Sequence, residues 1–335
     1  MYESFYGFAG SPFKLTPDAN FFYGSQGHMR ALAHLTFGLS QGEGFVVITG
    51  EVGAGKTTLV ERLSSQLDHN THTLVRLNTT QVSGDDLLRL VVAGLRVEVS
   101  GNNKASLLLG FEDIIRTHRL SGRRCVLAVD EAQGLSLSAL EELRVLSNLT
   151  DERGASLQTI LLGQPDFRRM LASPELEQLR QRVLASYHLS PLDASETQAY
   201  VEHRLTAVGW SGAPQIKNAA FDAVHRHSGG IPRRINRLCA RVLLYGALEK
   251  TWTVTAEMVN AIALELNEDL DGVSSPPMDC AGDETEIRNG QQSAFYNSYS
   301  KVQADLVERV ANLEARMDRR EQLFRRLYEA LGRLK

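Results

Sequence analysis

Residues 45–57 read FVVITGEVGAGKT, an apolar run followed at once by the pattern GxxxxGK[ST] over residues 50–57. An apolar run without in/out alternation is typical of a strand buried on both faces, and the apolar periodicity of residues 59–67 predicts a helix after the loop. Glycines allow such a loop to turn its backbone N–H groups inward, and the start of the helix adds positive potential for a phosphate. We therefore predict a phosphate-binding loop in which Lys56 reaches the β- and γ-phosphates of a nucleotide and Thr57 ligates Mg²⁺.

An ordinary glycine-rich turn is the alternative interpretation of this loop. Typical residue frequencies produce the pattern in roughly one chain of this length in a hundred, and the flanking strand and helix make a chance match rarer still. We therefore expect the loop and the first residues of the helix to bind nucleotide. The predicted binding residues are Gly50, Glu51, Val52, Gly53, Ala54, Gly55, Lys56, Thr57 and Thr58.

A second apolar run, residues 125–129, ends in the acidic pair Asp130 and Glu131. Open α/β sheets bind ligands at the carboxyl ends of their strands. We expect Asp130 to hold the Mg²⁺ shell and Glu131 to polarise a water for attack on the γ-phosphate. An acidic pair after a strand is commonly a solvated turn, but the phosphate loop about 75 residues upstream favours the catalytic interpretation.

Two weaker features follow along the chain. Gln164 ends the next predicted strand, residues 157–163, where its amide could sense phosphate or orient the water. Arg233 and Arg234 open a predicted helix after Gly-Gly-Ile-Pro, and arginine is suited to polydentate phosphate contact. The alternative for both arginines is an ordinary place on the surface.

The alternation of apolar runs and amphipathic stretches indicates an α/β fold with a parallel sheet covered by helices. We assign this part to residues 1–190, and an all-helical domain with only helical periodicity to residues 191–268. Residues 269–300 combine Gly, Ser, Pro, Asn and acidic residues, which predicts a flexible linker. The predicted strands cover residues 45–49, 73–77, 125–129, 157–163 and 184–189, and the predicted helices between them include residues 85–95, 105–120 and 137–149.

Residues 301–335 carry an apolar heptad pattern that starts at Leu306 and is interrupted by Arg320. The segment has nine Lys or Arg and six Asp or Glu, a net charge of +3. About four heptads are enough for a short coiled coil. A single amphipathic helix that folds back on the body is an equally weighted alternative.

Composition excludes several classes of protein. Of the 335 residues, 43% are hydrophobic and 23% charged, which is ordinary for a soluble globular chain. The net charge of −4 argues against a broadly basic nucleic-acid surface, although a local basic patch stays open. Three widely spaced cysteines fit a reducing compartment better than a disulfide framework or a zinc site. We read no signal peptide and no apolar run near the roughly 20 residues of a spanning helix, and therefore expect a cytoplasmic protein.

Taken together, the loop at residues 50–57, the Asp-Glu-Ala-Gln strand end at residues 130–133, Gln164 and the Gly-Ile-Pro-Arg at residues 230–233 resemble an AAA+ ATPase. The resemblance covers about residues 1–265. Within that superfamily the chain is similar to secretion ATPases of the ExeA/GspA type. It looks closest to the shorter subgroup associated with exosortase (PEP-CTERM) and exopolysaccharide loci. The fold implied is a P-loop NTPase of the AAA+ type, with a helical lid and a coiled-coil-like helix after it.

The resemblance also implies roles for single residues. Gln164 falls at the sensor 1 position, and Arg233 falls at sensor 2, where it would contact the γ-phosphate from the lid. Arg182 falls where an arginine finger acting on a neighbouring subunit is expected, with Arg180 as the alternative. Residues 17–23 would lie against the adenine. Lys56, Glu131, Gln164, Arg182 and Arg233 are thus the predicted catalytic residues, with Thr57 and Asp130 as the metal ligands.

The implied function is hydrolysis of ATP with Mg²⁺, coupled to assembly or regulation of an envelope secretion or exopolysaccharide system. Expected partners are further copies of this chain and secretion or polysaccharide-export components, which would bring the protein to the inner membrane without a membrane span. Longer GspA-type proteins continue into a membrane helix and a periplasmic peptidoglycan-binding domain, so direct peptidoglycan binding is not expected here. The alternative is a DNA-binding AAA+ regulator similar to transposition target-selection ATPases, which should carry a basic surface or a helix-turn-helix domain.

Overall fold

The computed structural model describes residues 2–271, apart from residues 17, 19–20, 79–81, 97–100, 102, 149, 152–153 and 156. The heptad segment 301–335 and nearly all of the predicted linker lie outside the described residues. The coiled coil therefore stays a prediction. The last described helix continues through Asp271, three residues into the range assigned to the linker.

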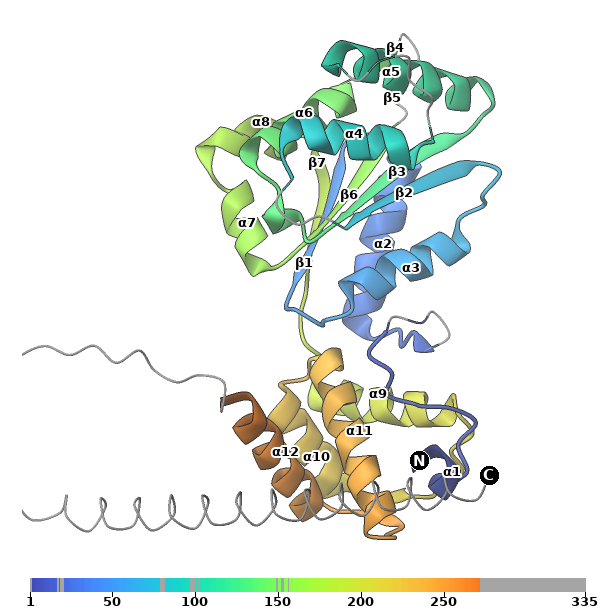
Figure 1. Cartoon of the computed structure of the whole chain (residues 1–335), viewed down its shortest axis with the longest axis vertical. Helices are drawn as coiled ribbons and strands as arrows, with labels where there is room; N and C mark the ends of the chain where they lie inside the picture. Colours follow the sequence, from blue (N-terminus) through green and yellow to red (C-terminus); the bar gives the residue numbers. More distant parts are fainter. Residues whose placement is uncertain are drawn as a thin grey trace, which may run out of the picture. The chain divides into compact units, whose positions relative to one another are not determined.

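Five strands form one sheet in the order β2-β3-β6-β1-β7, and every neighbouring pair is parallel (Figure 1). Each predicted strand is present. The central strands β1 and β6 are buried along their whole length, as their continuous apolar sequences predict. The strands are β1 (Phe45–Gly50), β2 (His72–Asn78), β3 (Arg124–Asp130), β6 (Leu157–Gly163) and β7 (Val183–Leu189).

The register of the sheet brings the predicted site residues to one edge. Thr49 of β1 is opposite Gly163 of β6, and Asn78 of β2 is opposite Asp130 of β3. Because the strands are parallel, all their carboxyl ends reach this edge. The phosphate loop (residues 50–57), the acidic pair and Gln164 are therefore neighbours although they are far apart in the sequence.

Helices cover both faces of the sheet, and two separate cores form there. Side chains alternate along β1, so that Phe45 and Val47 enter one core while Val46 and Ile48 enter the other. The first core is closed by α4 (Gly84–Gly94), α5 (Lys104–Leu120), α6 (Leu137–Asn148), α7 (Pro165–Leu171), α8 (Glu177–Arg180) and two 3-10 turns (Ala132–Gly134 and Pro174–Leu176), and the second by α2 (Gln26–Gln41) and α3 (Lys56–Gln66). A two-stranded hairpin follows α6, formed by β4 (Thr150–Asp151) and β5 (Gly154–Ala155).

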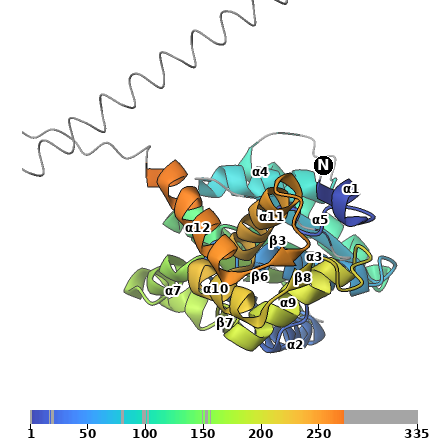
Figure 2. The same ribbon diagram turned by 90° about the horizontal axis from the view of Figure 1, so that it is seen from below.

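A third core belongs to the helices after residue 191. Figure 2 shows α12 beside α10 and α11. Short strands β8 (Gln215–Ile216) and β9 (Thr253–Val254) pair in parallel between the helices, a detail that the helical periodicity did not indicate. The helices are α9 (Ala194–Thr206), α10 (Asn218–Ser228), α11 (Pro232–Leu248) and α12 (Ala256–Asp271).

The first residues of the chain pack with this helical part. Tyr6, at the end of α1 (Tyr2–Tyr6), and the following Phe8 and Phe13 are buried in the third core. The sequence-based assignment put these residues with the α/β part, residues 1–190. In the structure they pack among the helices instead, where burial of their aromatic rings stabilises this position. The described residues between Lys14 and Tyr23 lie near the phosphate loop, because they line the same cavity as residues of the loop.

Candidate functional site

The phosphate loop leaves β1 at Gly50 and enters α3 at Lys56. Gly53 (φ +84°) and Gly55 (φ +101°) have left-handed backbone conformations that other residues rarely adopt, which explains the glycines at these two positions. Lys56 is only 5% exposed, and its Nζ donates to the carbonyl oxygens of Gly50 (2.8 Å) and Glu51 (3.0 Å). Burial lowers the pKa of Lys56, while nearby carboxylates, Glu131 first among them, oppose that shift. Carbonyl groups of the phosphate loop thus bind the ammonium group of the loop's own lysine.

The metal ligands predicted from the sequence are in contact. Thr57 Oγ1 donates to Asp130 Oδ2 at 2.6 Å, which joins the start of α3 to the end of β3. A hydroxyl and a carboxylate are hard oxygen ligands, the kind that Mg²⁺ uses when phosphates and waters complete its shell. Among the described residues there is no cluster of three or more His, Cys, Asp or Glu that could hold a metal ion by itself. The donor set therefore fits a nucleotide-bound Mg²⁺.

Glu131 is held by two amides. Its Oε2 accepts hydrogen bonds from Gln164 Nε2 (3.0 Å) and from Gln133 Nε2. The amide oxygen of Gln133 in turn accepts from the backbone N–H of Gln164 at 3.0 Å. Burial alone would raise the pKa of Glu131, but the bonds from Gln164 and Gln133 and the charge of Lys56 outweigh it, so the pKa lies below its usual value. The carboxylate is therefore ionised at neutral pH.

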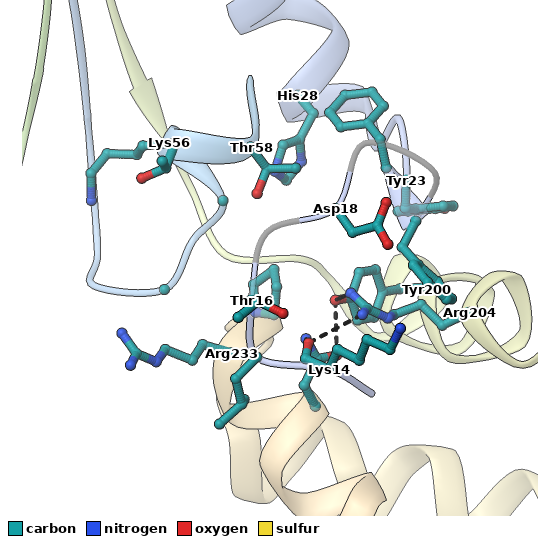
Figure 3. A pocket seen from close by; sticks show the side chains of 18 of the residues that line it. Lys14, Thr16, Asp18, Tyr23, His28, Lys56, Thr58, Tyr200, Arg204 and Arg233 are labelled. Carbon is teal, nitrogen blue, oxygen red and sulfur yellow. Dashed lines mark hydrogen bonds between the residues drawn. The ribbon is translucent and has the colours of Figure 1, made fainter. Parts of the chain in front are cut away.

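A cavity of about 460 Å³ opens beside the phosphate loop, within the size range of small-molecule sites (Figure 3). In Figure 3, Lys56 and Arg233 lie toward one side of it, and Tyr23, Tyr200 and Arg204 toward the other. Of residues 17–23, which the resemblance places against adenine, the described ones all line this cavity. The lining is Lys14, Leu15, Thr16, Asp18, Phe21, Phe22, Tyr23, His28, Val52, Gly53, Gly55, Lys56, Thr57, Thr58, Glu131, Tyr200, Arg204, Pro232, Arg233 and Asn236.

Arg204 of α9 fastens the chain's first residues to the helical part. It is 7% exposed and donates to the carbonyl oxygens of Pro12 (Nε, 2.6 Å) and Lys14 (Nη2, 3.2 Å) and to the phenol of Tyr200 (Nη1, 2.9 Å). Tyr200 in turn donates to Asn236 Oδ1 of α11 at 2.9 Å. This network fixes one wall of the cavity.

Arg233 meets the phosphate loop directly. Its backbone N–H donates to the Gly53 carbonyl oxygen at 3.2 Å, and a Cβ at Gly53 would lie 2.4 Å from the Cβ of Arg233. The close approach of α11 to the loop therefore requires glycine at position 53. The exposed side chain of Arg233 lines the cavity, as the sensor 2 assignment requires.

Arg182 and Arg180 are not part of this cavity. Arg182 precedes β7, and its carbonyl oxygen accepts from the N–H of Phe45. This contact lies at the amino ends of the strands, whereas Gly50 lies at their carboxyl ends. Its Nη1 donates to the Ser147 carbonyl oxygen at 3.3 Å. Arg180 is more exposed; it pairs with Glu177 and donates to the Ala172 carbonyl oxygen at 3.2 Å. Within one chain, neither arginine reaches the phosphate loop.

Several lining and supporting residues were missed by sequence reasoning. His28, Tyr200, Arg204 and Asn236 belong to no recognisable motif, and their contacts join distant parts of the chain. Gln133 had a weak indication, because it follows the acidic pair by two residues.

Comparisons with known proteins agree with this geometry. A family model described as an AAA domain matches residues 39–171. General secretion pathway protein A of Aeromonas hydrophila is 42% identical over 248 residues, which are 73% of this chain and 44% of that protein. The chain thus spans less than half the length of this relative.

Three solved structures share the fold at low sequence identity. The Cdc6p structure from Pyrobaculum aerophilum matches with a TM-score of 0.59 at 16% identity, over 77% of this chain and 75% of that one. The Aeropyrum pernix ORC2 protein in its ADPNP–ADP complexes gives 0.54 at 15%, over 74% and 70%. The Thermotoga maritima RuvB Holliday junction branch migration motor gives 0.52 at 20%, over 75% and 72%.

The AAA domain match includes both the phosphate loop and the acidic end of β3, and the solved structures extend the likeness to the helical part. In the part of the chain that the structure describes, no helix is long and apolar enough to cross a membrane. The match, the fold and the contact between Thr57 and Asp130 lead to one conclusion: this chain contains an AAA domain and has the AAA+ fold of a P-loop ATPase.

Proposed function

We propose that the protein binds ATP with Mg²⁺ in the cavity beside the phosphate loop and hydrolyses it to drive a step in envelope secretion. The observation that carries the first half is the 2.6 Å contact between Thr57 and Asp130, which joins the phosphate loop to the acidic strand end. The triphosphate would lie on the side of Lys56 and Arg233. The base would lie against the aromatic rings on the other side, which include Tyr23 and, next to Arg204, Phe21.

Thr57 and Asp130 would hold the Mg²⁺. When bound, the ion neutralises charge on the β- and γ-phosphate oxygens. Lys56 already presents its ammonium group to carbonyl oxygens of the loop, and phosphate oxygens could replace those acceptors at little cost in hydrogen bonds. Backbone N–H groups of the loop would supply the remaining contacts to phosphate.

Glu131 would act as the base. Its carboxylate is ionised and can accept a proton from the water that attacks the γ-phosphorus, while the bond to the bridging oxygen breaks and ADP leaves. Gln164 and Gln133 hold the carboxylate in one orientation, and Gln164 would also contact the γ-phosphate as sensor 1. Arg233, on the first turn of α11, would sense the same phosphate from the helical part.

A neighbouring copy of the chain would complete the site. Arg182 and Arg180 lie away from their own phosphate loop, which is what a residue that acts on an adjacent subunit requires. Arg182 remains our first assignment. Arg180 is the alternative, and the observation in its favour is that its side chain is more exposed than that of Arg182. We therefore propose that the active form is a homo-oligomer.

The secretion role rests on the similarity to General secretion pathway protein A. We propose that the ATPase acts with envelope secretion components at the inner membrane, and that exosortase-associated polysaccharide export is the specific system. We also propose that residues 1–268 carry the nucleotide site while residues 301–335 recruit the protein to its partners. A loss of exported polysaccharide or secreted protein, when Lys56→Ala replaces the native gene in the organism that carries it, would support this role.

ATP titration of the purified protein tests the nucleotide site. Wild type should bind ATP in the presence of Mg²⁺, and Lys56→Ala should lose binding because the loop loses its buried cation. Lys217→Ala is the matched control, since Lys217 is exposed and does not line the cavity. ATP binding by Lys56→Ala at wild-type affinity would contradict the proposed site.

A further inference from the structure

The ring of His28 supports the phosphate loop from α2. It is 6% exposed, and its Nε2 lies 3.1 Å from the carbonyl oxygen of Ala54, inside the loop. Its Nδ1 lies 2.7 Å from Ser25 Oγ. Figure 3 shows the ring beside Thr58, at the point where the loop enters α3. No part of the proposed ATP chemistry uses this histidine.

The two contacts define the protonation of the ring. Burial lowers the pKa of His28, so the ring is neutral at pH 7 and has one donor and one acceptor nitrogen. A carbonyl oxygen only accepts, so Nε2 carries the hydrogen and donates to Ala54. Nδ1 then accepts from the hydroxyl of Ser25, the residue that also caps α2 by accepting from the N–H of His28 at 3.3 Å. The helix cap therefore orients the ring.

The contact with Ala54 determines the direction of a neighbouring N–H group. In a trans peptide, the C=O of one residue and the N–H of the next point in opposite directions. Because Nε2 holds the Ala54 carbonyl, the N–H of Gly55 points away from His28. The ring also fills the space beside Gly55, where a Cβ would lie 2.7 Å from Nε2. Without the ring, the peptide between Ala54 and Gly55 could rotate.

We propose that His28 is a positioning residue for the nucleotide: by binding the Ala54 carbonyl it keeps the Gly55 N–H directed at the phosphate position. The inference rests on the proposed function, because it concerns the affinity of the same loop for ATP. His28 touches no reacting atom in this scheme. Its effect therefore belongs to binding, and kcat at saturating ATP should change little.

Three substitutions separate the two ring contacts. Gln places its amide nitrogen close to the position of Nε2 and can still donate to Ala54, whereas Asn reaches only the position of Nδ1 and can still bond to Ser25. Phe keeps the ring and loses both contacts. We expect His28→Phe and His28→Asn to raise Kd for ATP by about 3- to 10-fold, the effect of one lost neutral hydrogen bond. His28→Gln should stay within about twofold of wild type.

The control is His34→Phe, a change on the same helix at a ring that packs on Tyr187 and does not line the cavity. Urea unfolding without nucleotide is measured for every variant, because a purely structural role would lower stability without producing this order of affinities. Should His28→Phe not fold, the Asn and Gln variants still decide the question.

The outcomes are distinct. Equal Kd values for wild type and the Phe and Asn variants would overturn the inference, and so would a Gln variant as weak as the Asn variant. Wild-type protein that fails to bind ATP would instead overturn the proposed function, and the inference with it. ATP binding that is lost in Lys56→Ala but unchanged in all His28 variants would refute the inference alone.

Discussion

Replacing Arg204 with methionine should separate the first residues of the chain from the helical part. The substitution keeps an unbranched side chain at this buried position and removes the guanidinium group. Three oxygens lose a donor: the carbonyl oxygens of Pro12 and Lys14 and the phenol oxygen of Tyr200. The guanidinium also lies over the ring of Phe21, 4.8 Å from its centroid, and that contact is lost too.

The expected cost follows from these contacts. A hydrogen bond from a charged group contributes about 1.5–3 kcal/mol, and a buried carbonyl left without a donor costs about 1–3 kcal/mol. The Lys14 carbonyl keeps a long bond from Asn236 Nδ2 at 3.4 Å, which reduces its share. Removal of a buried cation also relieves a desolvation cost of several kcal/mol. We expect Arg204→Met to lower the free energy of unfolding by about 2–4 kcal/mol.

Urea unfolding measures this loss, and ATP titration measures its effect on the cavity wall. Affinity should fall together with stability, because Lys14 and Tyr200 line the cavity. Arg226→Met, at an exposed arginine of α10, is the matched control and should change stability by less than about 0.5 kcal/mol. A loss below about 1 kcal/mol for Arg204→Met, or unchanged ATP affinity despite a large loss, would refute the reasoning.

Three further predictions concern the oligomer, pH and the tail. Either Arg182→Ala or Arg180→Ala should keep ATP binding and lower turnover by roughly 10³-fold or more. Normal turnover in both variants would contradict the proposal that one of these arginines acts on the neighbouring subunit. Burial depresses the pKa of His28 in the folded state, although the bond to the Ala54 carbonyl and the charge of Glu196 oppose this shift. The contribution of His28 to stability is therefore present above the unfolded pKa of about 6.5 and is lost as pH falls through the folded pKa. Wild type should therefore lose more unfolding free energy between pH 7 and pH 5 than His28→Gln, and equal losses in urea titrations would contradict this. A chain that ends at Asp271 should bind ATP as the full chain does; failure to fold would make the tail structural.

The site residues at the carboxyl edge of the sheet could be predicted because each of them directly follows a strand that the sequence indicates. The strand at residues 157–163 has the predicted bounds, and β1 and β7 differ from prediction by one residue each. Once the sheet is parallel, its register places Asp130 and Gln164 beside the phosphate loop without further information. The contact between Thr57 and Asp130 follows from that arrangement.

The wall of the cavity could not be predicted in this way. Arg204 donates to the carbonyl oxygen of Pro12, 192 residues away in the sequence. Every residue has a backbone carbonyl, so no residue type in the sequence indicates this acceptor. His28 is one of two histidines on the amphipathic helix α2, and no sequence pattern distinguishes it from His34. The bond of Arg182 to Ser147 depends on how α6 packs against the start of β7, which periodicity does not determine.

The central claim, that Glu131 activates water for ATP hydrolysis, is tested most directly by phosphate release under single-turnover conditions. Glu131→Gln should bind ATP within about threefold of wild type and release phosphate at least about 10²-fold more slowly, because the base is lost while the side chain keeps its shape. Glu141→Gln, at an exposed glutamate of α6, should match wild type in both measurements. Phosphate release by Glu131→Gln at the wild-type rate would contradict the assignment.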